Sequence, residues 1–133
     1  MPYLLDTNVC IRLLNGTSLR AKESLARHPV SEVRLSSVVK GELLFGARKS
    51  ARPEANLTLL NAFFAPFVSV PFDDLAAEHY GRVRAILARD GQPIGPNDLL
   101  IAAIALANDH VLVSHNTGEF SRVPGLRLVD WEA

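Results

Sequence analysis

The stretch YLLDTN at residues 3–8 is the strongest indication of the architecture, because a short apolar run ends directly on a carboxylate and two more polar side chains. The apolar run predicts a buried strand, and Asp6, Thr7 and Asn8 carry the kind of side chain that caps a helix. The apolar residues that follow predict a short helix, which ends near Gly16. A strand that passes at once into a helix is the unit from which parallel α/β sheets are built.

The same alternation continues along the chain. Further strands are predicted at about 33–35, 67–70, 111–113 and 126–129, and further helices at about 18–27, 36–49, 53–64, 73–89 and 97–107. We therefore expect an α/β fold, with a three-layer α/β/α sandwich around a mainly parallel sheet of about five strands. In such sheets, ligands bind at the edge where the carboxyl ends of the strands lie.

Two aspartates stand where helices are predicted to begin. Asp6 directly follows the first strand, and Asp98 ends the sequence GPND at 95–98, directly before nine residues without a charge. A carboxylate in a first helical turn is favoured by about 0.3–1 kcal/mol, so each aspartate is also explained as a helix-start residue. Asn97 can cap the second helix equally well, which leaves Asp98 without an evident structural need.

Glu42 lies inside the helix predicted at 36–49, beside apolar residues. A carboxylate in such a place is costly unless it is paired or binds a cation. The alternatives are a solvated position, or an ion pair with Lys40 or Arg48.

The loop SHNTGEF at 114–120 follows the strand predicted at 111–113, so it should open on the same edge as Asp6. Glu119 brings another carboxylate to this edge. Ser114 and Asn116 can form hydrogen bonds to neighbouring carboxylates or to a metal-bound water. The alternative is an ordinary polar turn.

Three or four acids are thus expected at one edge of one sheet. Like charges so close repel one another and raise one another's pKa values, and a bound cation removes the conflict. Carboxylate oxygens suit Mg²⁺ or Mn²⁺, whereas the four histidines fall in separate segments without a zinc spacing. Only His115 is near enough to this edge to be considered as a general base.

Four segments in this order resemble the PIN-domain family, and within it the VapC-type toxins of toxin–antitoxin pairs. They are YLLDTN at 3–8, SSVVKGELLFGA at 36–47, PIGPNDLLIAA at 93–103 and NTGEFSRVPGL at 116–126. The resemblance extends from Tyr3 to Trp131. It implies a PIN-like fold and a metal-dependent endoribonuclease that hydrolyses RNA with Mg²⁺ or Mn²⁺.

The resemblance also implies roles for particular residues. Asp6, Glu42 and Asp98 match the three core acids of the family, and Glu119 is the acid we assign to the fourth position. The supporting polar residues are Thr7, Asn8, Ser114 and Asn116, of which Ser114 stands where relatives often have threonine. The family further implies a homodimer, and a VapB-type antitoxin whose C-terminal segment lies over the active-site groove in a larger toxin–antitoxin complex.

Length and composition are consistent with this interpretation. The 133 residues suit one domain, 1–133, and 48% of them are hydrophobic, which excludes a disordered chain. The single cysteine, Cys10, cannot form an internal disulfide, and we expect it in the core. No signal peptide is evident and the longest apolar run, 99–107, is far shorter than the roughly 20 residues of a membrane helix. We expect a cytoplasmic protein.

The charge balance bears on how the protein could bind nucleic acid, but it does not decide the function. Fourteen Lys and Arg equal fourteen Asp and Glu, which argues against nucleic-acid binding by bulk electrostatics. A nuclease remains compatible, because acids that bind metal leave the rest of the surface net positive. Arg12, Arg48 and Arg82 are candidates for holding an RNA backbone, although each is also explained as a solvated residue.

Two other classes of function stay open. In a haloacid-dehalogenase-like phosphatase, Asp6 would be a nucleophile, but that pattern requires a second Asp where Asn8 stands, and a later lysine that is missing. The other class is a non-catalytic module that only binds RNA or protein. Phospho-aspartate trapping would favour the phosphatase, and an inability to bind Mg²⁺ or Mn²⁺ would favour the module.

Overall fold

The computed structural model describes all residues, 1–133. The chain forms β1 (Tyr3–Leu5), α1 (Thr7–Asn15), α2 (Leu19–Ala26), a 3-10 turn (Val30–Glu32), β2 (Val33–Ser36), α3 (Ser37–Arg48), α4 (Pro53–Phe64), β3 (Val68–Val70), α5 (Asp74–Arg89), α6 (Pro96–Asn108), β4 (Val111–Val113), α7 (Thr117–Phe120) and β5 (Arg127–Val129). The predicted strands and long helices are confirmed, with bounds that differ by one or two residues.

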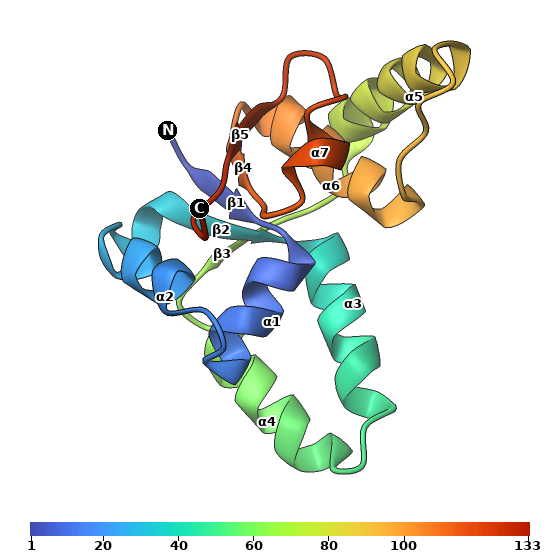
Figure 1. The fold of residues 1–133 in the computed structure, drawn as a ribbon. Helices are drawn as coiled ribbons and strands as arrows, with labels where there is room; N and C mark the ends of the chain where they lie inside the picture. The colour runs from blue at the N-terminus through green and yellow to red at the C-terminus, as the bar shows by residue number, and fades with distance from the viewer.

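The five strands form one sheet in the order β3-β2-β1-β4-β5, and every neighbouring pair is parallel. The α/β fold that the sequence predicted is confirmed, with a fully parallel sheet in place of a mainly parallel one. Helices α1, α3 and α4 lie on one side of the sheet, and α5, α6 and α7 lie on the other (Figure 1). The chain reverses its direction of travel across the sheet between β1 and β4, and a crevice opens at the carboxyl ends of strands where this happens.

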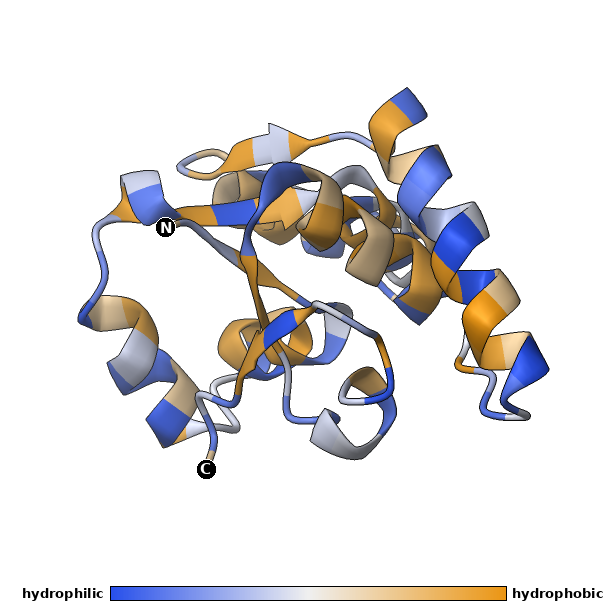
Figure 2. Cartoon of the chain, turned by 90° about the horizontal axis from the view of Figure 1, so that it is seen from above, coloured by the Kyte–Doolittle hydropathy of each residue, from blue (hydrophilic) through white to orange (hydrophobic).

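The core lies between the sheet and the helices on its two faces. The central strands are fully buried at Leu4, Leu5, Leu35 and Leu112, and each such leucine stabilises the fold by about 1.5–3 kcal/mol. Helix α6 buries residues 101–105 without interruption, which explains its uniformly apolar sequence. In Figure 2 the strands are mostly hydrophobic, and hydrophilic residues lie on the outer turns of the helices. Cys10 is fully buried, as predicted.

One local interpretation was wrong. Helix α6 begins at Pro96 with Gly95 before it, so Asn97 lies within the first turn and does not cap the helix. Proline is well suited to this position, because its φ is already helical and the missing N–H is one that the helix leaves unpaired. The polar loop after β4, for which an ordinary turn was the alternative, contains the one-turn helix α7. None of the helices has both the length and the apolar character needed to cross a bilayer.

Candidate metal centre

Asp6 occupies the position between β1 and α1, at the centre of the sheet. Its residue exposure is only 4%, and its Oδ1 accepts a hydrogen bond of 2.9 Å from the backbone N–H of Val9. Burial raises the pKa of Asp6, while hydrogen bonds from Ser114 and Val9 act in the opposite direction. Ser114 is itself fully buried, directly after β4, which pairs with β1. The aspartate therefore caps the helix and also presents a second oxygen at the carboxyl edge of the sheet.

Glu42 is brought to the same place by a contact between α1 and α3. The hydroxyl of Thr7 donates a hydrogen bond of 2.8 Å to Glu42 Oε1. Neither ion pair that the sequence suggested is formed, and the Lys40 ammonium instead lies 5.2 Å from the centre of the Phe64 ring. Glu42 therefore has a neutral hydrogen-bond donor beside it and no paired cation.

Asp98 and Glu119 meet at the backbone of Gly95. The N–H of Gly95 donates to Glu119 Oε1 at 2.7 Å, and the side-chain amide of Asn116 donates to Glu119 Oε2 at 2.8 Å. A Cβ atom placed on Gly95 would lie 3.4 Å from Asp98 Oδ2 and 3.5 Å from Glu119 Oε1. The one-turn helix α7 thus brings Glu119 against the loop that carries Asp98.

The pKa values show how strongly these acids influence one another. Burial, the charge of Glu119 and a hydrogen bond with Glu119 raise the pKa of Asp98 to about 7, with smaller contributions from Asp6 and Glu42. The Gly95 N–H lowers the pKa of Glu119, and the Asp98 hydrogen bond lowers it further. Near neutral pH, Asp98 is therefore only partly ionised beside the carboxylate of Glu119. All four predicted acids contribute to one electrostatic cluster.

A second polar group lies at the ends of β4 and β5. Asp130 Oδ2 lies 2.9 Å from His115 Nδ1, and Glu132 Oε1 lies 2.6 Å from Arg12 Nε. We did not predict this group, although Asp130 follows a strand directly, as Asp6 does. Because Arg12 is paired with Glu132, it is not a free cation for RNA.

The family model of the PIN domain matches residues 3–126. The chain belongs to the PIN domain family. The matched range begins at β1 and includes Asp6, Glu42, Asp98 and Glu119.

Curated relatives of this PIN domain match it almost from end to end. It is 39% identical to the tRNA(fMet)-specific endonuclease VapC of Shigella flexneri, over 98% of each chain. It is 36% identical to the ribonuclease VapC2 of Rickettsia felis, over 99% of each chain. The crystal structure of DNA-bound VapBC from Salmonella typhimurium contains a chain that superposes with a TM-score of 0.93, at 38% identity and 98% coverage of both chains.

The ligand chemistry of the cluster in this PIN domain fits a hard divalent cation. Four carboxylates supply oxygen atoms alone, and none of the four is paired with a lysine or arginine within 4.0 Å. The spacing is open, because only His115, Asp130 and Glu132 place three ligand atoms within 4.8 Å of one another. The four acids thus offer suitable donors and an uncompensated negative charge, at separations wider than those of the second polar group.

Proposed function

We propose that this PIN domain, residues 1–133, is a Mg²⁺- or Mn²⁺-dependent endoribonuclease and the toxin component of a VapBC-type toxin–antitoxin pair. The names of full-length relatives support an RNA-cleaving hydrolase. The observation that carries the metal dependence is the Asp98–Glu119 pair at Gly95, where the charge of Glu119 contributes to the raised pKa of Asp98. A divalent cation would relieve the repulsion between carboxylates for the whole cluster.

In this proposal Asp6 and Asp98 hold the cation, and Glu42 and Glu119 are further ligands, directly or through water. When bound, the cation would lower the pKa of water and offset the charge that develops on the phosphate oxygens. The protein's own contribution is orientation. Thr7 fixes Glu42, while Gly95 and Asn116 fix the two oxygens of Glu119.

Ser114 has a related supporting role in the proposal. It is buried between Asp6 and the loop that leads to α7, and its Oγ accepts a hydrogen bond of 3.0 Å from the backbone N–H of Asn116. The same side chain lowers the pKa of Asp6 by hydrogen bonding. Ser114 thereby opposes the effect of burial, which raises the pKa of Asp6 overall. Asn8 is exposed beside the cluster and is a further polar residue at this edge.

The proposed protein partners are a VapB-type antitoxin and a second copy of the chain, in a larger toxin–antitoxin complex. A hollow of about 610 Å³ lies between α1, α3 and α4, and Thr7 and Glu42 are among the residues that line it. Phe45 and Leu59 in its lining are 64% and 62% exposed. An antitoxin segment in this hollow would cover apolar surface and the acidic cluster together. The solved VapBC complexes of relatives support this class of partner.

RNA cleavage with and without metal tests the proposal. The purified chain is expected to cut RNA with Mg²⁺ or Mn²⁺, and to stop when EDTA is added. Asp98→Asn should abolish cutting, whereas Asp90→Asn, which alters an exposed aspartate outside the cluster, should retain it. Because two relatives are named for tRNA(fMet), initiator tRNA is the first substrate to test. Cleavage that persists in EDTA, or in Asp98→Asn, would refute the metal-dependent mechanism.

A further inference from the structure

A second hollow lies on the other side of the loop that contacts the acids. It has a volume of about 340 Å³, and its lining includes Pro93, Ile94 and Pro96 from this loop. Gly95, in the middle of the same loop, donates its N–H to Glu119. The acidic cluster and this hollow are therefore separated by the thickness of one peptide segment.

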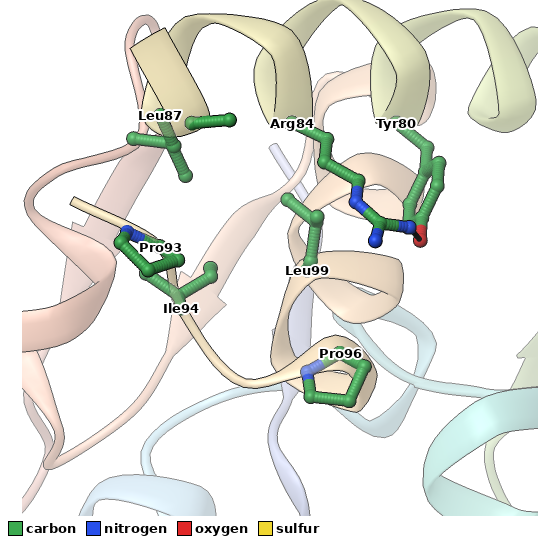
Figure 3. Close-up of a pocket in the computed structure, with 8 residues that line it drawn as sticks. Tyr80, Arg84, Leu87, Pro93, Ile94, Pro96 and Leu99 are labelled. Atoms are coloured by element: carbon green, nitrogen blue, oxygen red, sulfur yellow. Dashed lines mark hydrogen bonds between the residues drawn. The ribbon is translucent and has the colours of Figure 1, made fainter. Parts of the chain in front are cut away.

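The lining of this hollow combines an apolar floor with one aromatic ring and one cation. Leu87 and Leu99 form buried parts of the floor, and Tyr80 and Arg84 come from α5 (Figure 3). Its volume lies at the lower end of the range of about 300–1,000 Å³ that is usual for small-ligand sites. An apolar floor with few polar groups suits a flat ring better than a hydrated ion.

Arg84 is held at this hollow without being neutralised. Its Nη1 donates a hydrogen bond of 2.7 Å to the Tyr80 hydroxyl, and its guanidinium carbon lies 5.7 Å from the centre of the Tyr80 ring. The Tyr80 ring is itself fixed edge-on against Phe72, with centroids 6.0 Å apart. Arg84 forms no ion pair with a carboxylate, so its exposed guanidinium keeps a full positive charge.

A second arginine contacts the same loop. Arg122 donates a hydrogen bond of 3.2 Å to the carbonyl of Pro93 and also has no paired carboxylate. Arg84 and Arg122 thus add a feature of two positive charges next to the four acids, and the charge of Arg122 helps to lower the pKa of Glu119. Such a feature complements a polyanion that must approach a negatively charged centre.

We propose that the hollow lined by Tyr80, Arg84, Ile94 and Pro96 receives one nucleobase of the RNA substrate, next to the phosphodiester that is cut. This inference rests on the proposed ribonuclease function. Unstacked RNA bases bind proteins by stacking on aromatic rings and on guanidinium planes, and both are present here. Arg84 stacks on the base or contacts its flanking phosphate. The loop that lines the hollow also leads to Asp98, so the bound base lies near the acids. Arg84 is a substrate-positioning residue in this proposal.

Steady-state kinetics on an RNA with one mapped cut site tests the proposal. Arg84→Ala should raise KM about tenfold, with kcat changed by less than about threefold, because base stacking contributes to binding. Arg89→Ala is the matched control, since Arg89 is exposed on the same helix, lies 3.7 Å from Asp90 and does not line the hollow. The control should change KM by less than about twofold. Arg84→Gln, which keeps a donor for Tyr80 but not the charge, should fall between the two.

A series of otherwise identical RNAs, each with one abasic nucleotide near the cut, identifies the bound base. For the unaltered protein, one abasic position should raise KM about tenfold. For Arg84→Ala the same position should have an effect below about twofold, since that contact is already lost. Melting temperatures of all variants, measured alongside, should agree because Arg84 and Arg89 are both exposed.

Two results would overturn the nucleobase site alone. The first is equal kinetics for Arg84→Ala and Arg89→Ala, with every abasic RNA cut alike. The second is a changed oligomeric state of Arg84→Ala with unchanged cleavage, which would make the hollow a protein interface. By contrast, an unaltered protein that cuts no RNA with Mg²⁺ or Mn²⁺ overturns the ribonuclease function, and the nucleobase site with it.

Discussion

Two groups of acids lie at the same edge of the sheet, and they differ in what balances their charge. In the first group, Asp6, Glu42, Asp98 and Glu119 are oriented by hydroxyl, amide and backbone N–H donors, and no cationic side chain pairs with them. In the second group, Glu132 is paired with Arg12, and Asp130 lies beside His115. Both groups include an aspartate that directly follows a strand. A place directly after a strand is therefore not enough to distinguish a ligand-binding acid from a structural one.

Charge compensation makes that distinction. A carboxylate that the fold has already paired contributes to stability, and a further cation would have to compete with the arginine. A carboxylate that the fold orients but leaves unpaired is costly until something positive binds. The second group satisfies a purely geometric criterion for a metal site better than the first. The uncompensated charge nevertheless favours the first group as the metal centre.

The sharpest contrast comes from the two aspartates that follow strands. Asp6→Asn removes a proposed metal ligand and should reduce RNA cleavage by about a thousandfold or more, because a metal ion supplies several kcal/mol of transition-state stabilisation. Asp130→Asn keeps the shape of the side chain and leaves the first group intact, so cleavage should stay within about threefold. Initial rates on one RNA at saturating Mn²⁺ provide the comparison. Equal losses in the two variants would contradict the separation of the groups.

The second group should matter more for stability. Arg12→Gln leaves the Glu132 carboxylate, whose side chain is 9% exposed, without its cation. We expect the free energy of unfolding to fall by about 2 kcal/mol, because a largely buried charge loses its partner. Urea denaturation measures the change, and Arg20→Gln, at an exposed arginine that forms no ion pair, is the control. An unchanged midpoint would show that the Arg12–Glu132 pair contributes nothing to folding.

A substitution in the first group should have the opposite effect and raise the free energy of unfolding. The pKa of Asp98 is raised from 3.8 to about 7 in the folded chain, so the folded state favours the neutral carboxyl group. The contribution of Asp98 to the free energy of unfolding is fully present below about pH 4, and it is lost as the pH rises through about 7. In EDTA, Asp98→Asn should therefore stabilise the protein by about 1–2 kcal/mol at pH 8, after allowance for solvent screening, and by almost nothing at pH 4. Thermal unfolding at both pH values measures this effect. An equal stabilisation by Asp98→Asn at pH 4 and at pH 8 would contradict the prediction.

Much of the fold could be predicted because local patterns determine it. Apolar runs followed by capping side chains located β1, β2 and the helices after them, and Ser36 and Asp73 cap α3 and α5 through their own side chains. Asp6 and Asp98 were identifiable for the same reason, since each stands beside a boundary that the sequence marks. Glu42 was identifiable because a carboxylate among apolar neighbours requires an explanation.

The remaining features depend on contacts between distant parts of the chain. Arg12 and Glu132 pair across almost the whole sequence, and nothing beside either residue indicates the other. The contact of Glu119 with Gly95 requires α7, a helix of four residues that is too short to produce a periodic pattern. The Tyr80–Arg84 pair has ordinary helical spacing, and its importance is evident only once the loop before α6 is seen to lie against it.

The glycine at position 95 has a practical consequence. Its φ of −54° is one that alanine adopts without strain, and the added methyl group would meet Asp98 and Glu119 at ordinary van der Waals distance. The methyl group would lie against one oxygen atom of Asp98 and one of Glu119, while every charged side chain of the protein remained unaltered. Under the proposed function, Gly95→Ala would therefore alter the acidic cluster by one carbon atom and preserve the charged surface for studies of what binds the chain.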